Sequence, residues 1–158
     1  MGRPESGARV LALDLGSRRL GVALSDPSAT IAAPLETVPV TGPRRAAERV
    51  REICRRHDVT LVVVGWPRNM DGTRGPAARQ AEAFAERLRS LLAVPVELWD
   101  ERLSTAAAER VLIEADVRRS ERRGARDRVA ASFILQAYLD ARRNRLSRID
   151  SGHNEDRP

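Results

Sequence analysis

Residues 9–25 read Arg9-Val-Leu-Ala-Leu-Asp14-Leu-Gly16-Ser-Arg-Arg-Leu20-Gly21-Val-Ala-Leu-Ser25. Two short apolar runs, residues 9–15 and 20–25, flank a polar turn, and this pattern predicts two strands joined as a hairpin. Asp14 is a carboxylate inside an apolar strand, where it requires a cation, hydrogen-bond donors or water. Gly16 leaves room above this acid for a phosphate or a metal ion. The hairpin therefore predicts the start of a sheet and one corner of a functional site; the structural alternative is an acid that caps the turn.

The rest of the chain alternates between helix and strand patterns. Prolines punctuate a third strand within residues 32–40, which suits the edge of a sheet. The β-branched run Leu61-Val-Val-Val-Gly65 is typical of a parallel strand buried on both faces. The remaining expected elements are helices from Pro43 and after Pro76, a strand at 94–99, a short helix to about 115 and a last helix at about 126–145. This order predicts an α/β fold with a mixed five-stranded sheet, three antiparallel strands followed by parallel ones, flanked by helices.

The length of 158 residues suits one domain, which we expect over residues 9–146, with disordered termini at 1–8 and 147–158. The single Cys54 cannot form an internal disulfide, so we expect a cytoplasmic protein. No stretch approaches the roughly 20 apolar residues of a membrane span, so no membrane partner is expected. Composition does not predict the oligomeric state.

Acidic residues occur in three segments that begin or end a predicted strand or helix. They are Asp14, the adjacent pair Asp100 and Glu101, and Asp127, which opens the last helix in phase with its apolar stripe. Neighbouring residues of an extended segment point to opposite sides, so only one of the pair can face Asp14; we expect Glu101, with Asp100 in support. Mg²⁺ and Mn²⁺ prefer oxygen ligands, and the carboxyl ends of parallel strands meet at one sheet edge. We therefore predict that Asp14, Glu101 and Asp127 are catalytic and bind one or two such ions, the alternatives being turn and helix-end acids.

Arginine dominates the charge of the chain. All 28 basic residues are arginine and the net charge is +6, which favours polyanionic partners. Codon bias of a GC-rich genome is an alternative cause, so the location of the arginines is more informative than their number. The densest cluster, residues 118–128, runs into Asp127. The residues that we expect to contact the phosphates of a substrate are Arg18, Arg19, Arg68, Asn69, Arg74, Arg102, Arg122 and Arg126.

Four ordered motifs resemble those of the YqgF (RuvX) family, which is similar to RuvC-type Holliday junction resolvases. They are Asp14-Leu-Gly-Ser-Arg-Arg-Leu-Gly21-Val-Ala, Val64-Gly-Trp-Pro-Arg-Asn-Met-Asp-Gly-Thr-Arg-Gly-Pro76, Asp100-Glu-Arg-Leu-Ser-Thr105 and Asp127-Arg-Val-Ala-Ala-Ser-Phe-Ile-Leu135. The resemblance covers residues 10–138. It implies an RNase H-like fold and a divalent-metal nuclease that matures the 5′ end of 16S rRNA during ribosome biogenesis, with precursor ribosomal particles as partners.

The expected activity is metal-assisted hydrolysis of a phosphodiester bond in structured RNA or branched DNA. Junction resolution has been proposed for the same family, and the sequence does not distinguish the two substrates. A nucleic-acid-binding ribosome-assembly factor without catalysis is a second alternative. A phosphotransferase of the actin-like class shares the Asp-x-Gly hairpin but requires two such domains, and the present chain has one hairpin.

Overall fold

The computed structural model describes residues 9–103 and 123–155, with side chains described for 9–103 and 129–148. Within these ranges one sheet has the strand order β3-β2-β1-β4-β5. The strands are β1 (Arg9–Leu15), β2 (Arg19–Ser25), β3 (Ala32–Pro39), β4 (Val59–Trp66) and β5 (Val96–Asp100). β1, β2 and β3 pair antiparallel, whereas β4 is parallel to both β1 and β5. The predicted mixed sheet is confirmed, and the proline-containing β3 lies at its edge.

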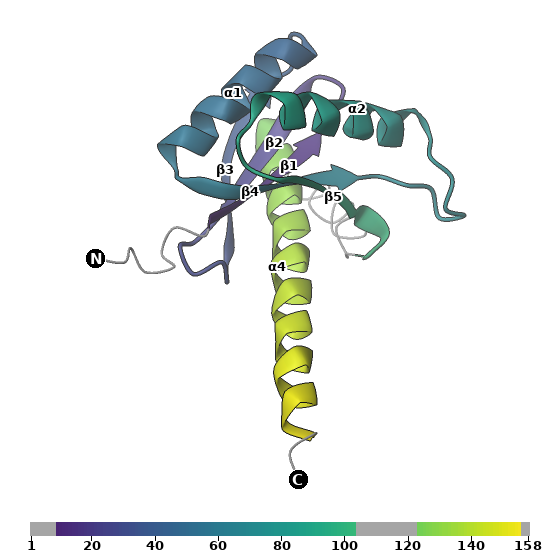
Figure 1. Cartoon of the computed structure of the whole chain (residues 1–158). Coiled ribbons are helices and arrows are strands. Elements are labelled where there is room, and N and C mark those ends of the chain that lie inside the picture. Colours follow the sequence, from purple (N-terminus) through teal and green to yellow (C-terminus); the bar gives the residue numbers. More distant parts are fainter. Residues whose placement is uncertain (1–8, 104–122, 156–158) are drawn as a thin grey trace.

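Helices cover both faces of the sheet (Figure 1). α1 (Pro43–Arg56) and α2 (Pro76–Leu91) lie on one face, and α4 (Arg123–Glu155) lies on the other; a single 3₁₀ turn, η2 (Glu101–Leu103), follows β5. β1 alternates between the two faces, as a strand must. Leu11 and Leu13 belong to the core beneath α1 and α2, whereas Val10 and Ala12 pack with α4. The same alternation directs Asp14, the next even residue, towards the face that α4 covers.

α4 is attached to the sheet by a buried apolar stripe and by one amide side chain. Ala131, Ile134, Leu135 and Leu139 are buried against the sheet. Gln136 accepts a hydrogen bond from the amide of Ala32 (2.9 Å) and donates one to the carbonyl of Thr30 (3.0 Å). These contacts fix the axial position of the helix, so the segment that carries Asp127 lies towards the carboxyl end of β1.

The end of α4 differs from the sequence prediction. The helix continues to Glu155, so residues 147–155, which the polar composition predicted to be disordered, are helical. Neither proline nor glycine occurs between Asp140 and Ser151, so no strong stop signal ends the helix earlier. Residues 1–8 and the short helix expected after residue 103 lie outside the described residues. In the parts of the chain that are described, no helix is both long enough and apolar enough to span a membrane.

Candidate active site

The carboxyl ends of β1, β4 and β5 lie side by side at one edge of the sheet. Leu13 of β1 pairs with Val64 of β4, and Trp66 of β4 pairs with Asp100 of β5. Asp14 is half-buried, one residue from the end of β1, and its antiparallel partner is Gly21. The register thus brings residues 14, 65 and 101, far apart in sequence, to one edge, as the sequence predicted for strands of this order.

Glu101 is buried at this edge, with 7% of its surface exposed. Its position is defined by Gly65, because a Cβ atom added there would lie 2.8 Å from Glu101 Oε1 and 3.5 Å from the carbonyl oxygen of Leu13. The same added atom would lie 2.9 Å from Ile134 Cδ1 of α4. The Glu101 carboxylate therefore crosses the end of β4, beneath α4, towards the residue that precedes Asp14. A side chain at position 65 would therefore require Glu101 or Ile134 to move.

Asp100 has a different environment from its neighbour. Arg102 donates to it from Nε (3.0 and 3.1 Å) and from Nη2 (2.6 Å), and the Arg102 amide donates to Oδ1 (3.0 Å). Arg68 Nη1 lies 3.7 Å from Asp100 Oδ2. The hydrogen bonds from Arg102 hold the pKa of Asp100 below its usual value, and the charges of both arginines act in the same direction. The two acids thus take up separate environments, because Asp100 ends β5 and Glu101 begins the 3₁₀ turn η2.

The loop between β4 and α2 is stabilised by contacts of the Arg68 side chain. The Arg68 guanidinium stacks on the Trp66 ring, with 4.7 Å between its carbon and the ring centroid, and donates to the Gly72 carbonyl. Asn69 donates to Thr73 Oγ1 (2.9 Å). Of the two tryptophans, Trp99 packs edge-to-face on Tyr138 at 5.6 Å, so its role here is packing. The loop is therefore braced against the turn that carries Glu101.

Asp127 lies in the described backbone of α4, seven residues before Ile134. Seven residues are about two helical turns, so positions 127 and 134 share a helical face. The side chains of Asp127 and Arg126 are not described, and Arg122 lies outside the described residues. Among the side chains that are described, no group of three potential metal ligands occurs. The structure thus brings Asp14 and Glu101 to one edge, and the contribution of Asp127 stays a prediction.

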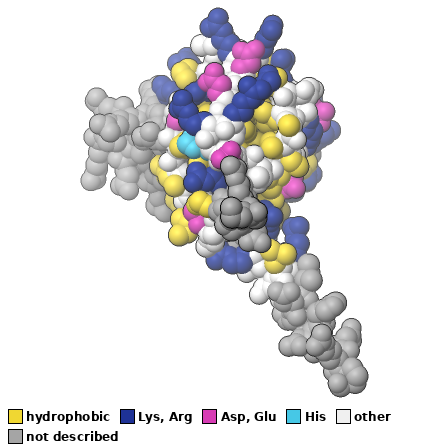
Figure 2. Space-filling view, turned by 60° about the vertical axis from the view of Figure 1, so that its left-hand side comes forward, with side chains coloured by type: hydrophobic (Ala, Val, Ile, Leu, Met, Phe, Trp, Pro, Cys, Tyr) yellow, Lys and Arg dark blue, Asp and Glu magenta, His cyan; other side chains and the backbone are white. Residues whose placement is uncertain are grey.

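The arginines predicted to bind phosphate fall into two groups. Arg68 and Arg102 contact Asp100, and Arg74 forms an ion pair with Glu82 at 2.5 Å. Arg18 is exposed in the turn between β1 and β2, and Arg19 begins β2. Figure 2 shows arginines spread over the surface with acidic residues among them, not gathered in one patch. Location at the acidic edge is therefore the better guide to substrate contact.

Two features of the site were not foreseen from the sequence. Gly65 was read only as the end of a strand, although a glycine after a β-branched run signals close approach of another group. The second is a pocket of about 380 Å³ between β1 and α2, lined by residues that follow Asp14 in sequence. Its lining comes from three separate stretches of the chain, residues 15–17, 40–43 and 80–87, so no local sequence pattern predicts it.

The sequence is similar to those of known proteins. The model of the RuvX family, described as Holliday junction resolvase, matches residues 8–141. A protein of Geobacillus thermodenitrificans named "Putative pre-16S rRNA nuclease" is 52% identical over 137 residues, 85% of this chain and 99% of that protein. One of the same name from Pelotomaculum thermopropionicum is 48% identical over 151 residues, 95% of this chain and 97% of that protein.

The fold also resembles that of solved structures. T. thermophilus RuvC in complex with Holliday junction substrate aligns with a TM-score of 0.54 and 20% identity, over 85% of this chain and 95% of that chain. A second structure of Thermus thermophilus RuvC aligns with a TM-score of 0.55 and 19% identity, over 86% and 96% of the two chains. This likeness confirms the predicted RNase H-like fold.

Proposed function

Because the chain belongs to the RuvX family of nucleases, we propose that it is a divalent-metal-dependent enzyme that cleaves precursor 16S rRNA near its 5′ end. The observation that supports this proposal most strongly is the buried carboxylate of Glu101, which crosses Gly65 towards the end of β1. A nuclease site needs carboxylates from separate elements at one point, and Gly65 leaves room for this one at the end of β1.

The residues at the edge fit a divalent cation. Asp14 and Glu101 supply hard oxygen donors, and Asp127 belongs to the helix that covers both. Carboxylates held close together repel one another, and a cation between them relieves that repulsion. Mg²⁺ or Mn²⁺, once bound, would activate a water molecule for attack and stabilise the leaving oxygen. We propose Asp14, Glu101 and Asp127 as its ligands.

Other residues of the edge would hold the site and the substrate. Asp100 accepts hydrogen bonds from Arg102 and forms an ion pair with Arg68. These contacts would fix the turn from which Glu101 projects. Arg18 and Arg19 are proposed to contact the sugar-phosphate backbone from the turn after β1. Arg74, Asn69, Arg122 and Arg126 are proposed to act in the same way from the β4–α2 loop and from the start of α4. Such contacts give affinity and position, with little sequence discrimination.

The names of the relatives favour precursor 16S rRNA as the substrate. We propose that this RNA is presented in cytoplasmic ribosomal precursor particles. A four-way DNA junction is the second candidate, because the family is described as Holliday junction resolvase and the aligned RuvC structure holds such a substrate. The two differ in a measurable way. An enzyme for rRNA cleaves a precursor fragment at one position near the mature 5′ end, whereas a resolvase cuts two opposed strands of a junction.

The experiment compares both substrates with the purified full chain in Mg²⁺, in Mn²⁺ and in a chelator. We expect the rRNA precursor to be cut with the higher kcat/KM and the reaction to stop in chelator. Asp14→Asn serves as the control for a contaminating nuclease. Cleavage that persists in Asp14→Asn would contradict the proposed site, and binding without any metal-dependent cleavage would favour a ribosome-assembly factor.

A further inference from the structure

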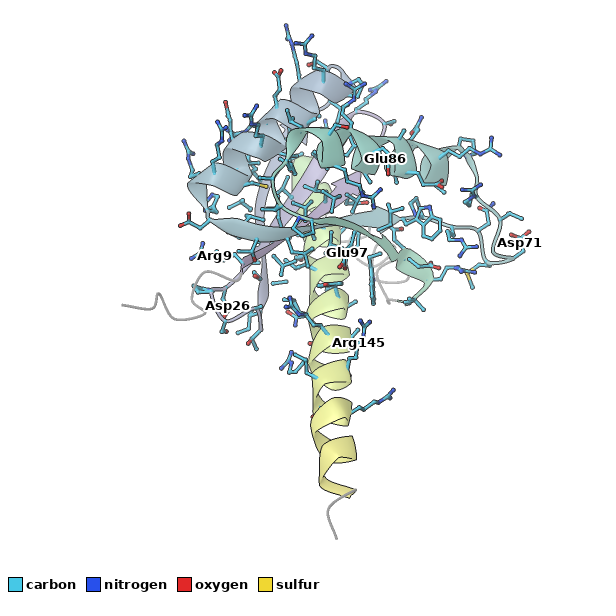
Figure 3. All side chains as sticks on the ribbon, in the orientation of Figure 1. Arg9, Asp26, Asp71, Glu86, Glu97 and Arg145 are labelled. Carbon is cyan, nitrogen blue, oxygen red and sulfur yellow. The ribbon has the colours of Figure 1, made fainter. Side chains whose placement is uncertain are left out.

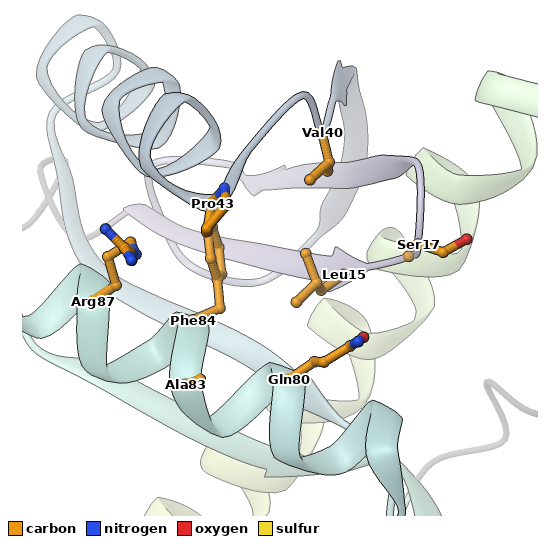
Figure 4. Close-up of a pocket in the computed structure, with 9 residues that line it drawn as sticks. Leu15, Ser17, Val40, Pro43, Gln80, Ala83, Phe84 and Arg87 are labelled. Atoms are coloured by element: carbon orange, nitrogen blue, oxygen red, sulfur yellow. The ribbon is translucent and has the colours of Figure 1, made fainter.

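A pocket of about 380 Å³ opens between the end of β1 and α2 (Figure 4). Its volume falls in the roughly 300–1,000 Å³ range of small-molecule sites. Leu15, Val40, Pro43 and Phe84 supply its apolar walls, and Gln80 and Arg87 supply polar groups from α2. Leu15 follows Asp14 in β1 and therefore faces the other side of the sheet. The pocket and the carboxylates thus lie on opposite faces of the same edge, separated by the turn that begins at Gly16.

The pocket has the polarity expected for an anionic ligand with a flat apolar part. None of the described residues that line it is acidic. Arg87 is exposed and forms no ion pair or hydrogen bond with any described residue, and the same is true of the Gln80 amide. Pro43, which also lines the pocket, is the first residue of α1. The positive end of the α1 dipole and Arg87 therefore both favour a phosphate at the mouth.

We propose that this pocket binds one unstacked nucleotide of the substrate strand, next to the scissile bond. This proposal rests on the proposed nuclease function. The base enters between Leu15 and Phe84, the Gln80 amide meets its hydrogen-bonding edge, and Arg87 meets a flanking phosphate. A strand that passes from Asp14 over Gly16 reaches the pocket directly, because Gly16 and Ser17 also line it. A single strand can turn a base outward in this way, whereas a continuous duplex cannot without unstacking.

The first test fills the pocket. Ala83 lines it from the surface of α2, so Ala83→Trp should occupy it without disturbing the core. Ser90→Trp is the control, since Ser90 is exposed about two turns further along α2 and does not line the pocket. Loss of base stacking predicts a KM raised about tenfold for a single-stranded RNA substrate in Ala83→Trp and a change of less than about twofold in the control. Equal KM values for the two variants would overturn the proposal.

The second test removes the base from the substrate. A series of oligonucleotides with one abasic site moved along the strand should show about a tenfold rise of KM at one position for the wild-type protein. Ala83→Trp should be insensitive to the abasic site at that position, because the pocket is already closed. Uniform behaviour along the strand would contradict a single-nucleotide pocket.

The third test does not depend on cleavage. Nucleoside monophosphates titrated into the wild-type protein should shift the NMR signals of Gln80 and Ala83, and Arg87→Gln should weaken this binding. Arg56→Gln removes the same charge from an exposed position of α1 that does not line the pocket, and should leave it unchanged. If the protein bound these nucleotides but cleaved no substrate, the proposed nuclease function alone would be wrong. If the protein cleaved its substrate but the NMR signals of Gln80 and Ala83 did not shift, the proposed nucleotide pocket alone would be wrong.

Discussion

Two acidic turns at opposite edges of the sheet use their carboxylates differently. Asp26 follows β2, and its carboxylate accepts hydrogen bonds from its own loop. The amides of Thr30 and Ile31 each donate to it at 2.8 Å, and the Ser28 hydroxyl donates as well. The Ile31 amide, the Ser28 hydroxyl and the Thr30 amide hold the pKa of Asp26 well below its usual range. Figure 3 shows this loop on the far side of the sheet from the loop that carries Asp71. Asp26 is therefore a structural acid.

At the other edge, the adjacent acids Asp100 and Glu101 have different roles: one supports the turn, and the other is proposed to act in catalysis. Asp100 takes the local donors, chiefly those of Arg102, and thereby fixes the turn. Glu101 is buried beside Gly65 instead, directed at the end of β1. The two neighbouring acids therefore have different surroundings, and we expect Asp100 to support the turn and Glu101 to act in the site. The comparison predicts that substitutions at the Asp14 edge alter activity and that substitutions in the Asp26 loop alter stability.

The largest effect is expected from the acids of the proposed metal site. Asp14→Asn, Glu101→Gln and Asp127→Asn should each lower kcat by roughly 10³-fold or more, because metal ligation supplies several kcal/mol of transition-state stabilisation. Without metal the three variants should melt at the wild-type temperature or above it, since each removes one of several mutually repelling charges. Cleavage kinetics in saturating Mg²⁺ and calorimetry in chelator provide the two measurements.

Asp26→Asn is the matched control for these variants, an acid-to-amide change at the opposite edge. It should retain wild-type kcat at a temperature well below its melting point. Wild-type rates in any of the three variants at the Asp14 edge would remove that residue from the site, and loss of activity in Asp26→Asn would break the distinction between the two edges.

The next effect tests the space beneath Glu101. Gly65→Ala introduces a Cβ that would lie 2.8 Å from Glu101 Oε1 and 2.9 Å from Ile134 Cδ1. Both atoms lie at the ends of flexible side chains, so they can move. The substitution should therefore lower the free energy of unfolding by only about 1 kcal/mol. Displacement of the carboxylate by about an ångström should nevertheless lower kcat about 100-fold. The measurements are kcat and the urea midpoint of the same preparation.

Gly42→Ala is the control for this change, because nothing lies within 4 Å of the added Cβ and the backbone there is extended. It should leave kcat unchanged and lower the free energy of unfolding by no more than about 1 kcal/mol, the cost of alanine at an N-cap. If Gly65→Ala kept full activity, Glu101 would not act from its observed position; if it unfolded the protein, the glycine would serve packing alone.

Much of this fold could be read from sequence because its signals are local. The hairpin of β1 and β2 follows from apolar runs around a turn, and the β-branched run of β4 predicts burial on both faces. The order of helices and strands then specifies which strands are parallel. The preference for Glu101 over Asp100 came from alternation along an extended segment, whereas Glu101 begins the 3₁₀ turn that follows β5. Which of the two acids binds metal stays a prediction.

Other features depend on contacts between distant segments. Gly65, Glu101 and Ile134 come close together only when β4, η2 and α4 are packed against one another. The contacts of Arg68 and Arg102 with Asp100 could not be read from the sequence, since a charge alone does not reveal its nearest partner. The contact of both arginines with substrate phosphates stays a prediction. The end of α4 was placed too early because the polar composition was taken for disorder, although no proline or glycine occurs between Asp140 and Ser151.

A smaller effect is expected at Asp100, the acid that supports the turn. Asp100→Asn loses the paired, charge-assisted contact with Arg102 and loosens the segment from which Glu101 projects. We expect kcat to fall about tenfold, as for a misaligned catalytic group. KM should not rise, because Arg68 and Arg102 are then released towards the substrate. A rise in KM with unchanged kcat would show instead that Asp100 acts in binding, and separate determination of the two constants decides this.

The smallest effect should be confined to stability and to one range of pH. Asp26→Asn keeps an acceptor oxygen but removes the charge to which two amides and a hydroxyl donate. Since the folded-state pKa of Asp26 is depressed, its charge stabilises the fold above its unfolded pKa of about 3.9, and this contribution is lost as pH falls through the folded value. The variant should therefore melt below the wild-type protein at pH 7, and the two melting temperatures should converge as the pH is lowered below about 4. Thr41→Ala, an exposed change elsewhere, should show no such convergence. Equal melting temperatures at pH 7, or a difference that grows on acidification, would mean that the Asp26 charge does not hold its loop, and the contrast between the two acidic turns would then rest on the active-site edge alone.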